Sequence, residues 1–377
     1  KKAYDDHEKQ IASTMVMEER PGAAAEVFVL TRGEYDKPDK NRKVLPNVPA
    51  ALPRLPAEAP ANRLALARWL CAPEHPLTAR VTVNRYWQQL FGIGLVGTSE
   101  DFGAQGEWPS HPELLDWLAL DFIEHGWDIK RTLKQIVLSA TYRQDSHVTS
   151  DLARRDRENR LMARGPRFRA DAEVVRDVTL ATSGLLTLQI GGRSVRPYQP
   201  PGIWEVVAHS SSNTSKYQRG TGEALFRRSL YTFWKRTAPP PGLMVFDAPT
   251  RDTCTARRPR TNTPLQALAL MNDEQYIEAA RKLAERILRE GGTTPESRLT
   301  YGFRLVTARH PEAAETAVLT RVLDRSRERF QQDKSAAEKL LAVGESPRNA
   351  QLDPIEHAAY TLLANLLLNL DETITKE

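Results

Sequence analysis

The sequence lacks most features that assign a chemistry directly. It has two cysteines in 377 residues, Cys71 and Cys254, and neither belongs to a CxxC or CxxCH pattern. Its eight histidines never cluster at the spacing of metal ligands. No apolar run approaches the ~20 residues that a membrane-spanning helix needs. We therefore expect no metal site, no cofactor bound within this chain and no membrane span.

Charge and glycine patterns are equally unspecific. The formal net charge is +5, spread over many residues, and aromatic residues make up 7% of the chain. A nucleic-acid-binding domain would concentrate its charge in a patch, so we expect no nucleic-acid partner. The glycines between residues 92 and 106 fit neither a dinucleotide-binding nor a phosphate-binding loop, and no G-x-S-x-G motif occurs.

Sequence patterns predict a mainly α fold. Apolar residues at helical spacing begin after Asn62, and the tail from residue 296 to 377 reads as three helices. Residues 13–35 read as two strands, residues 36–60 as a proline-rich extended linker, and "RRSLYTFWKR" as a strand. We predict a helical bundle-like core with a small N-terminal β part and long irregular loops. Residues 1–60 would end an upstream region, and residues 61–377 would form the main domain.

Positive charge is concentrated just before a predicted helix in the stretch "FDAPTRDTCTARRPRTNTPLQALALMND". Its arginines are Arg251, Arg257, Arg258 and Arg260. Thr263 has the features of an N-cap, Pro264 suits the first helical position, and Gln266 could close a capping box. Guanidinium groups beside a helix start favour a carboxylate, sulfate or phosphate. The alternative is internal pairing, with these candidate partners: Asp247, Asp252, Asp273 and Glu274.

Cys254 lies in the same cationic stretch. Nearby arginines would lower the pKa of its thiol and favour a nucleophilic thiolate. A lone cysteine is more often a packed small apolar residue, and a catalytic thiol also needs a base. We expect Cys254 to be packed and to react slowly with thiol reagents.

Two further segments carry candidate ligand-binding residues. The first, residues 84–111, contributes Arg85, Asp101, Trp108 and His111. Aromatic and carboxylate side chains on loops can hold a sugar or a metal, although core aromatics and ordinary turns explain them as well. The second segment is arginine-rich and contributes Arg164, Arg167 and Arg169. We expect this segment to meet residues 251–260 near Pro264 and to share one anion site with them.

Several stretches resemble a known family. "HPLTARVTVNRYWQQLFGIGLVGTSEDFGAQGEWPSHPELLDWLA" and "CTARRPRTNTPLQALALMND" are similar to the planctomycete PSD-one domain family, and the likeness extends over nearly the whole chain. The resemblance implies the C-terminal part of an exported protein of the periplasm or cell surface. It also implies a partner, a cytochrome c domain whose haem would lie in an upstream part absent here. The family offers no agreed activity and no catalytic residues to transfer.

Two functional hypotheses stay open at this point. The first is a binding or scaffold module for an acidic ligand such as sulfated polysaccharide, with Trp87, Trp108 or Trp204 as a stacking surface. The second is an enzyme acting on such a ligand, with its acid, base or nucleophile drawn from Asp101, His111, Asp252 and Cys254. A purely structural domain is the third alternative. The deciding question is whether residues 84–111 and 251–263 line one pocket.

Overall fold

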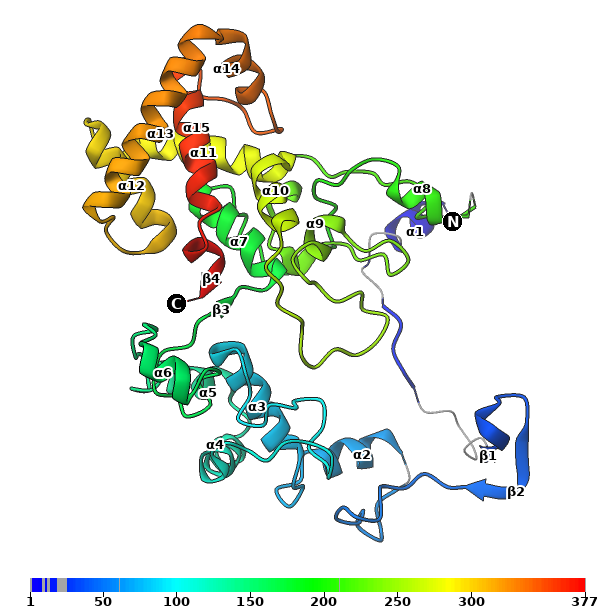
Figure 1. The fold of residues 1–377 in the computed structure, drawn as a ribbon. Coiled ribbons are helices and arrows are strands. Elements are labelled where there is room, and N and C mark those ends of the chain that lie inside the picture. The colour runs from blue at the N-terminus through cyan, green and yellow to red at the C-terminus, as the bar shows by residue number, and fades with distance from the viewer. Residues whose placement is uncertain are drawn as a thin grey trace. The chain divides into compact units, whose positions relative to one another are not determined.

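The computed structural model describes residues 2–8, 11, 14–18, 26–60, 62–209 and 211–376. Over these residues the chain forms fifteen α-helices and two small sheets, which confirms the predicted mainly α fold (Figure 1). The helices before residue 160 are α1 (Lys2–Glu8), α2 (Arg63–Leu70), α3 (Thr78–Phe91), α4 (Pro112–Glu124), α5 (Ile129–Leu138) and α6 (Ser150–Arg155). The later helices are α7 (Ala172–Ser183), α8 (Ile203–Val207), α9 (Pro241–Met244), α10 (Pro264–Asn272), α11 (Glu274–Glu290), α12 (Pro295–Thr307), α13 (Ala313–Gln332), α14 (Lys334–Leu341) and α15 (Pro354–Leu368).

The β structure differs from the prediction. Strand β1 (Val27–Leu30) forms as expected, but it pairs in antiparallel fashion with β2 (Pro38–Val44), a segment predicted to be linker. Pro38 is tolerated because it opens the strand, where its missing N–H costs least. The described residues 14–18 form no strand. A second sheet joins β3 (Phe168–Arg169) to β4 (Thr375–Lys376).

Two further predictions were wrong. The "RRSLYTFWKR" stretch forms only a short 3-10 turn, Ser229–Tyr231, and two isolated bridges, Thr187 with Arg227 and Val195 with Thr232. The tail holds four helices, α12 to α15, in place of three. The extra helix is α14, which is separated from α13 by Asp333 alone; Asp333 caps α14 by accepting from the backbone N–H of Ala336.

The chain divides into two compact units. One comprises Lys1–Val83 and Glu113–Ile129, and the other Asn84–Pro112 and Lys130–Glu377. The predicted boundary between residues 60 and 61 stays a prediction. The larger unit has its main core in the C-terminal helices, where α15 packs against α11, α13 and α14 through fully buried alanines and leucines. A second apolar cluster joins α7, α9 and α10.

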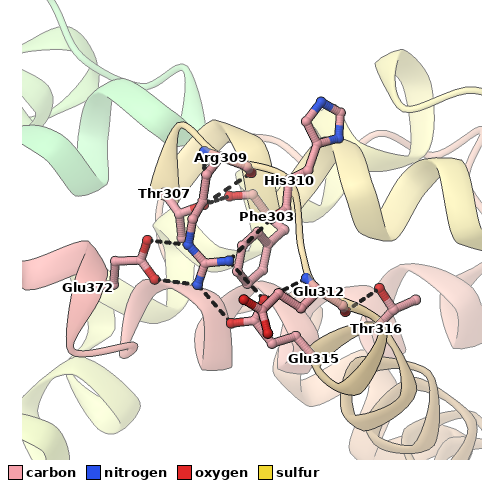
Figure 2. A network of polar contacts seen from close by, with 8 residues as sticks. All are labelled: Phe303, Thr307, Arg309, His310, Glu312, Glu315, Thr316 and Glu372. Carbon is pink, nitrogen blue, oxygen red and sulfur yellow. Dashed lines mark hydrogen bonds and ion pairs between the residues drawn. The ribbon is translucent and has the colours of Figure 1, made fainter. Parts of the chain in front are cut away.

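Hydrogen bonds from Arg309 connect the C-terminal end of the chain, through Glu372, to these helices. Its guanidinium donates to both carboxylate oxygens of Glu315, at 2.9 and 2.7 Å, and to both of Glu372, at 2.7 Å each (Figure 2). Figure 2 shows the guanidinium lying between the two carboxylates. These hydrogen bonds raise the pKa of Arg309 and lower that of Glu315 to about 2.

Candidate functional site

Helix α3 organises the loop that follows it. The fully buried amide of Asn84 accepts from the backbone N–H of Val96 at 2.9 Å and donates to the carbonyl of the same residue at 3.1 Å. A Cβ at position 94 would lie 2.5 Å from that carbonyl, so the turn requires Gly94. Arg160 supports the turn by donating to the carbonyls of Gly94 and Leu95.

The arginine-rich stretch is attached to the same helix and loop. Gln88, buried on α3, donates to the carbonyl of Ala256 at 3.2 Å, and its side-chain oxygen accepts from the hydroxyl of Ser99. Arg260 donates to the carbonyl of Gly92 at 2.7 Å. The residues around 256–260 are therefore held against the end of α3.

These contacts form a hollow that we call the Arg85 cavity. Its volume is about 500 Å³, and it is lined by Arg85, Gln88, Gln89, Glu100, Cys254, Thr255 and Ala256. The structure thus brings residues of both segments, 84–111 and 251–263, into one pocket. Sequence reasoning missed Gln88, Gln89 and Thr255. The spacing of Arg85, Gln88 and Gln89 at i, i+3 and i+4 was the available signal, because such residues share one helix face.

Arg85 is distinctive within this cavity. Its side chain is exposed and forms no hydrogen bond or ion pair with any described residue. Glu100, the carboxylate of the lining, is 3.5 Å from the guanidinium of Arg257, and both side chains are about half exposed. The cavity is therefore lined by one carboxylate that Arg257 neutralises and by one guanidinium whose donors are available to a ligand.

The other predicted arginines of the stretch are engaged within the protein. Arg258 donates to both oxygens of Glu173, at 2.5 and 3.2 Å. Burial alone would lower the pKa of Arg258, but hydrogen bonds and charge from Glu173 raise it. Arg260 lies 4.3 Å from the ring centre of Phe168 and 3.8 Å from Asp171.

These partners differ from the acidic residues that the sequence suggested. Sequence reasoning considered nearby carboxylates, whereas Glu100 and Glu173 are remote in sequence. Asp247 instead accepts from the backbone N–H of Thr261 at 2.7 Å.

Arg251 and Arg258 also line a second hollow, of about 610 Å³, along α7. Three carboxylates line it as well: Asp171, Glu173 and Asp177. The guanidinium of Arg251 lies 4.2 Å from the ring centre of Trp234. Arg228 lines this hollow too and lies 3.5 Å from Asp177, so the arginines and carboxylates of this lining are equal in number and offset one another.

The arginines before α7 hold the backbone and the C-terminus. Arg164 is buried and donates to the carbonyls of Asp156 and Arg157. Arg167 and Arg169 approach Asp371 at 2.7 and 3.3 Å. Neither hollow is lined by Arg164, Arg167 or Arg169. The two arginine segments do meet, but through the contact of Arg260 with Phe168, and the prediction of a shared anion site is not supported.

The remaining predicted residues lie outside the Arg85 cavity. Asp101 shapes its own turn, since its carboxylate accepts from the backbone N–H of Gly103 at 2.7 Å. His111 lies 3.1 Å from the hydroxyl of Ser110. Trp108 is 91% exposed, and Asp252 is exposed in its loop. The structure does not bring these four side chains together with Cys254.

Two of the proposed stacking tryptophans are unsuitable. Trp87 is buried and stacks on Phe91 with ring centres 4.1 Å apart. Trp204 is 1% exposed and packs against Tyr217 and Phe233. Neither ring face is open to a ligand.

The expectation that Cys254 is packed was wrong. Its side chain is exposed and lines the Arg85 cavity, because the loop that carries it runs over the surface of α3. Cys71 is also exposed, and both thiols are free. Cys254 is therefore accessible to reagents, and the slow reaction predicted from the sequence stays a prediction.

The helix start at Pro264 is confirmed, but the predicted capping box is not. Helix α10 begins at Pro264 with Thr263 at the N-cap, and the side chain of Thr263 makes no capping hydrogen bond. Gln266 is buried and donates to the carbonyl of Val245 and the hydroxyl of Thr261, both at 3.1 Å. Its burial keeps it from reaching back to the N-cap.

No group of three or more histidine, cysteine, aspartate or glutamate side chains suited to a metal occurs among the described residues. Among the residues that the structure describes, no helix combines the length and the apolar character that a membrane span requires.

Comparison with known proteins gives a family and no activity. The model of the family PSD1, described as "Protein of unknown function (DUF1553)", matches residues 62–323 and confirms the resemblance seen in the sequence. No curated protein matches the chain. No solved structure matches it either.

Proposed function

Because this chain belongs to the PSD1 family of unknown function, we propose a function from its site: it is a module that binds an acidic ligand in the Arg85 cavity. The observation that carries this proposal is the exposed Arg85 guanidinium, which has no partner among the described residues. A guanidinium fork matches the geometry of a sulfate or carboxylate.

A sulfated or carboxylated polysaccharide is the ligand class that we propose. The cavity is large enough for a sugar-sized group, and the exposed side chains of Gln89 and Thr255 offer hydrogen bonds to hydroxyl groups. Arg85 would take the anionic substituent. Selectivity would come from this pairing of one charge with neighbouring amide and hydroxyl groups.

Charge reversal tests the proposal with dextran sulfate as the probe and neutral dextran as its control. We expect Arg85→Glu to weaken dextran sulfate binding about tenfold or more, as the loss of a charge-assisted contact implies. Arg325→Glu is the matched variant. Arg325 is exposed on α13 and has no partner among the described residues, so the change in net charge is the same.

Titration calorimetry at physiological salt gives the affinities, and circular dichroism verifies the fold. Equal losses in both variants would mean that a basic protein attracts the polymer without a site. Arg258 is unsuitable for this test, because its reversal would place a carboxylate against Glu173.

An enzyme is the second candidate, favoured by the exposed Cys254 thiol beside Glu100 in the same cavity. Among the described lining residues there is no histidine to serve as its base, which favours binding over thiol catalysis. If the protein released reducing ends from the polysaccharide and Cys254→Ser abolished that release, thiol catalysis would become the better-supported function.

Thiol labelling also reports on the cavity. We expect iodoacetamide to modify Cys254 in the folded protein, and dextran sulfate to slow that reaction by covering the cavity. Cys71 is an internal control, since it is also exposed but does not line the cavity. Peptide mass mapping separates the two sites, and equal protection of both would contradict binding at the Arg85 cavity.

We also propose that the protein is exported to the periplasm or cell surface and that it functions together with a cytochrome c domain. Both come from the resemblance to the planctomycete family. Fractionation of cells that produce the full-length protein would test the location, and co-purification with haem would test the partnership.

A further inference from the structure

A second cavity lies in the smaller unit, and we call it the His75 cavity. It is mostly apolar, has a volume of about 500 Å³ and lies between the proline-rich stretch 53–60 and helix α2. Its walls include Pro53, Pro56, Pro60, Leu64, Trp69 and His75. This volume is within the range of small-molecule binding sites.

His75 brings a buried hydrogen-bond donor to these walls. The side chain is 7% exposed, and its Nδ1 accepts from the backbone N–H groups of Leu77 and Thr78 at 3.3 and 3.2 Å. An accepting Nδ1 assigns the proton of the neutral ring to Nε2. Nε2 is buried and has no hydrogen-bond partner among the described residues.

The rest of the wall does not satisfy this donor. Trp69 meets the imidazole edge to face, with ring centres 4.4 Å apart, and an aromatic face is a weak acceptor. The indole N–H of Trp69 already donates to the carbonyl of Pro53 at 2.7 Å. A buried donor left unpaired is costly, so an acceptor that reaches Nε2 from this cavity would gain a hydrogen bond at little loss of solvation.

We propose that the His75 cavity binds a small apolar molecule with one acceptor oxygen, such as a carbonyl, which accepts from Nε2 of His75. The prolines, Leu64 and Trp69 would surround the apolar body of the ligand. This site does not depend on the Arg85 cavity or on any acidic ligand.

Two probes of similar shape test the role of the donor. Acetophenone carries a carbonyl, and ethylbenzene has the same size without an acceptor. We expect the full chain to bind acetophenone about fivefold more tightly, the factor that one net hydrogen bond gives. Ligand-observed NMR titration measures both affinities. Equal affinities would overturn the role of His75, and binding of neither probe at millimolar concentration would overturn the site.

A pair of variants tests the location without removing His75, whose Nδ1 also supports the start of α3. Ala72 lines the cavity, so Ala72→Phe should fill it and abolish acetophenone binding. Ala67 is exposed on α2 and does not line the cavity, so Ala67→Phe should leave binding unchanged. Retained binding in a folded Ala72→Phe protein would place the probe elsewhere and refute the proposal.

Discussion

The C-terminal helices and the Arg85 cavity use arginine in opposite ways. In the helices, Arg309 donates hydrogen bonds to two carboxylates, and Arg327 donates to the carboxylate of Glu356. Arg281 is buried beside the carboxylate of Glu278. In the cavity, Arg85 stays exposed with no partner among the described residues. The surroundings of a guanidinium, rather than the local density of arginines, therefore separate a structural role from the binding role that we propose for Arg85.

The largest expected effect tests the structural half of this comparison. Glu278 is fully buried, accepts from the hydroxyl of Tyr198 at 2.7 Å and from the N–H of Ser346, and lies 3.6 Å from Arg281. Glu278→Ala would leave Arg281 as a buried charge without its carboxylate. We expect the free energy of unfolding to fall by about 3 kcal/mol or more, measured from urea midpoints.

The matched variant in the cavity is Glu100→Ala. Glu100 and Arg257 are about half exposed and 3.5 Å apart, so this pair should contribute less than about 1 kcal/mol. Similar losses in the two variants would show that the cavity and the helices do not differ in the way described.

The sequence predicted helix positions better than partners. The helix that follows Asn62 and the helix start at Pro264 were found because their signals lie within a few residues of the helix. Strand β2 was missed because its pairing with β1 depends on the partner strand, and its sequence is polar. The contact of Arg258 with Glu173 spans 85 residues, so no local pattern could reveal it.

The Arg85 cavity was predictable only in part. Arg85 and Cys254 were both predicted as ligand-binding residues. They line the same cavity because the buried Gln88 on α3 donates a hydrogen bond to the carbonyl of Ala256 and so positions the loop that carries Cys254. A residue that positions a loop carries no chemical signature in the sequence. Exposure of Cys254 likewise follows from the path of its loop, which composition does not specify.

An acid titration tests the hydrogen bonds between Arg309 and Glu315, for which we expect an intermediate effect on the free energy of unfolding. The pKa of Glu315 is lowered from 4.5 to about 2, chiefly by hydrogen bonds from Arg309. Its folded pKa lies below the unfolded value, so the stabilisation is complete above about pH 4.5 and is lost as pH falls towards 2. The side chains of Arg309 and Glu315 are 41% and 34% exposed, and solvent screening limits the effect to about 1 kcal/mol.

Urea midpoints between pH 6 and pH 2 measure this loss, and Glu315→Gln is the control because it cannot ionise. The pH dependence of the wild-type protein should exceed that of the variant. Parallel curves would show that Glu315 does not hold a lowered pKa in the folded protein.

The smallest expected effect, at Thr263, comes from a comparison of two helix starts, one in the C-terminal helices and one beside the arginine-rich stretch. At the start of α15, Asp353 accepts from the backbone N–H of Glu356 at 2.9 Å, so Asp353→Ala should cost about 1 kcal/mol. At the start of α10, beside the arginine-rich stretch, Thr263 makes no such bond, so Thr263→Ala should change stability by less than about 0.5 kcal/mol. The sequence alone would assign both residues the same capping role, and urea midpoints at constant slope distinguish them. An equal loss at both positions would mean that the Thr263 hydroxyl does cap α10 in solution, and the first turn of α10 would then be as firmly fixed as the turns of the C-terminal helices.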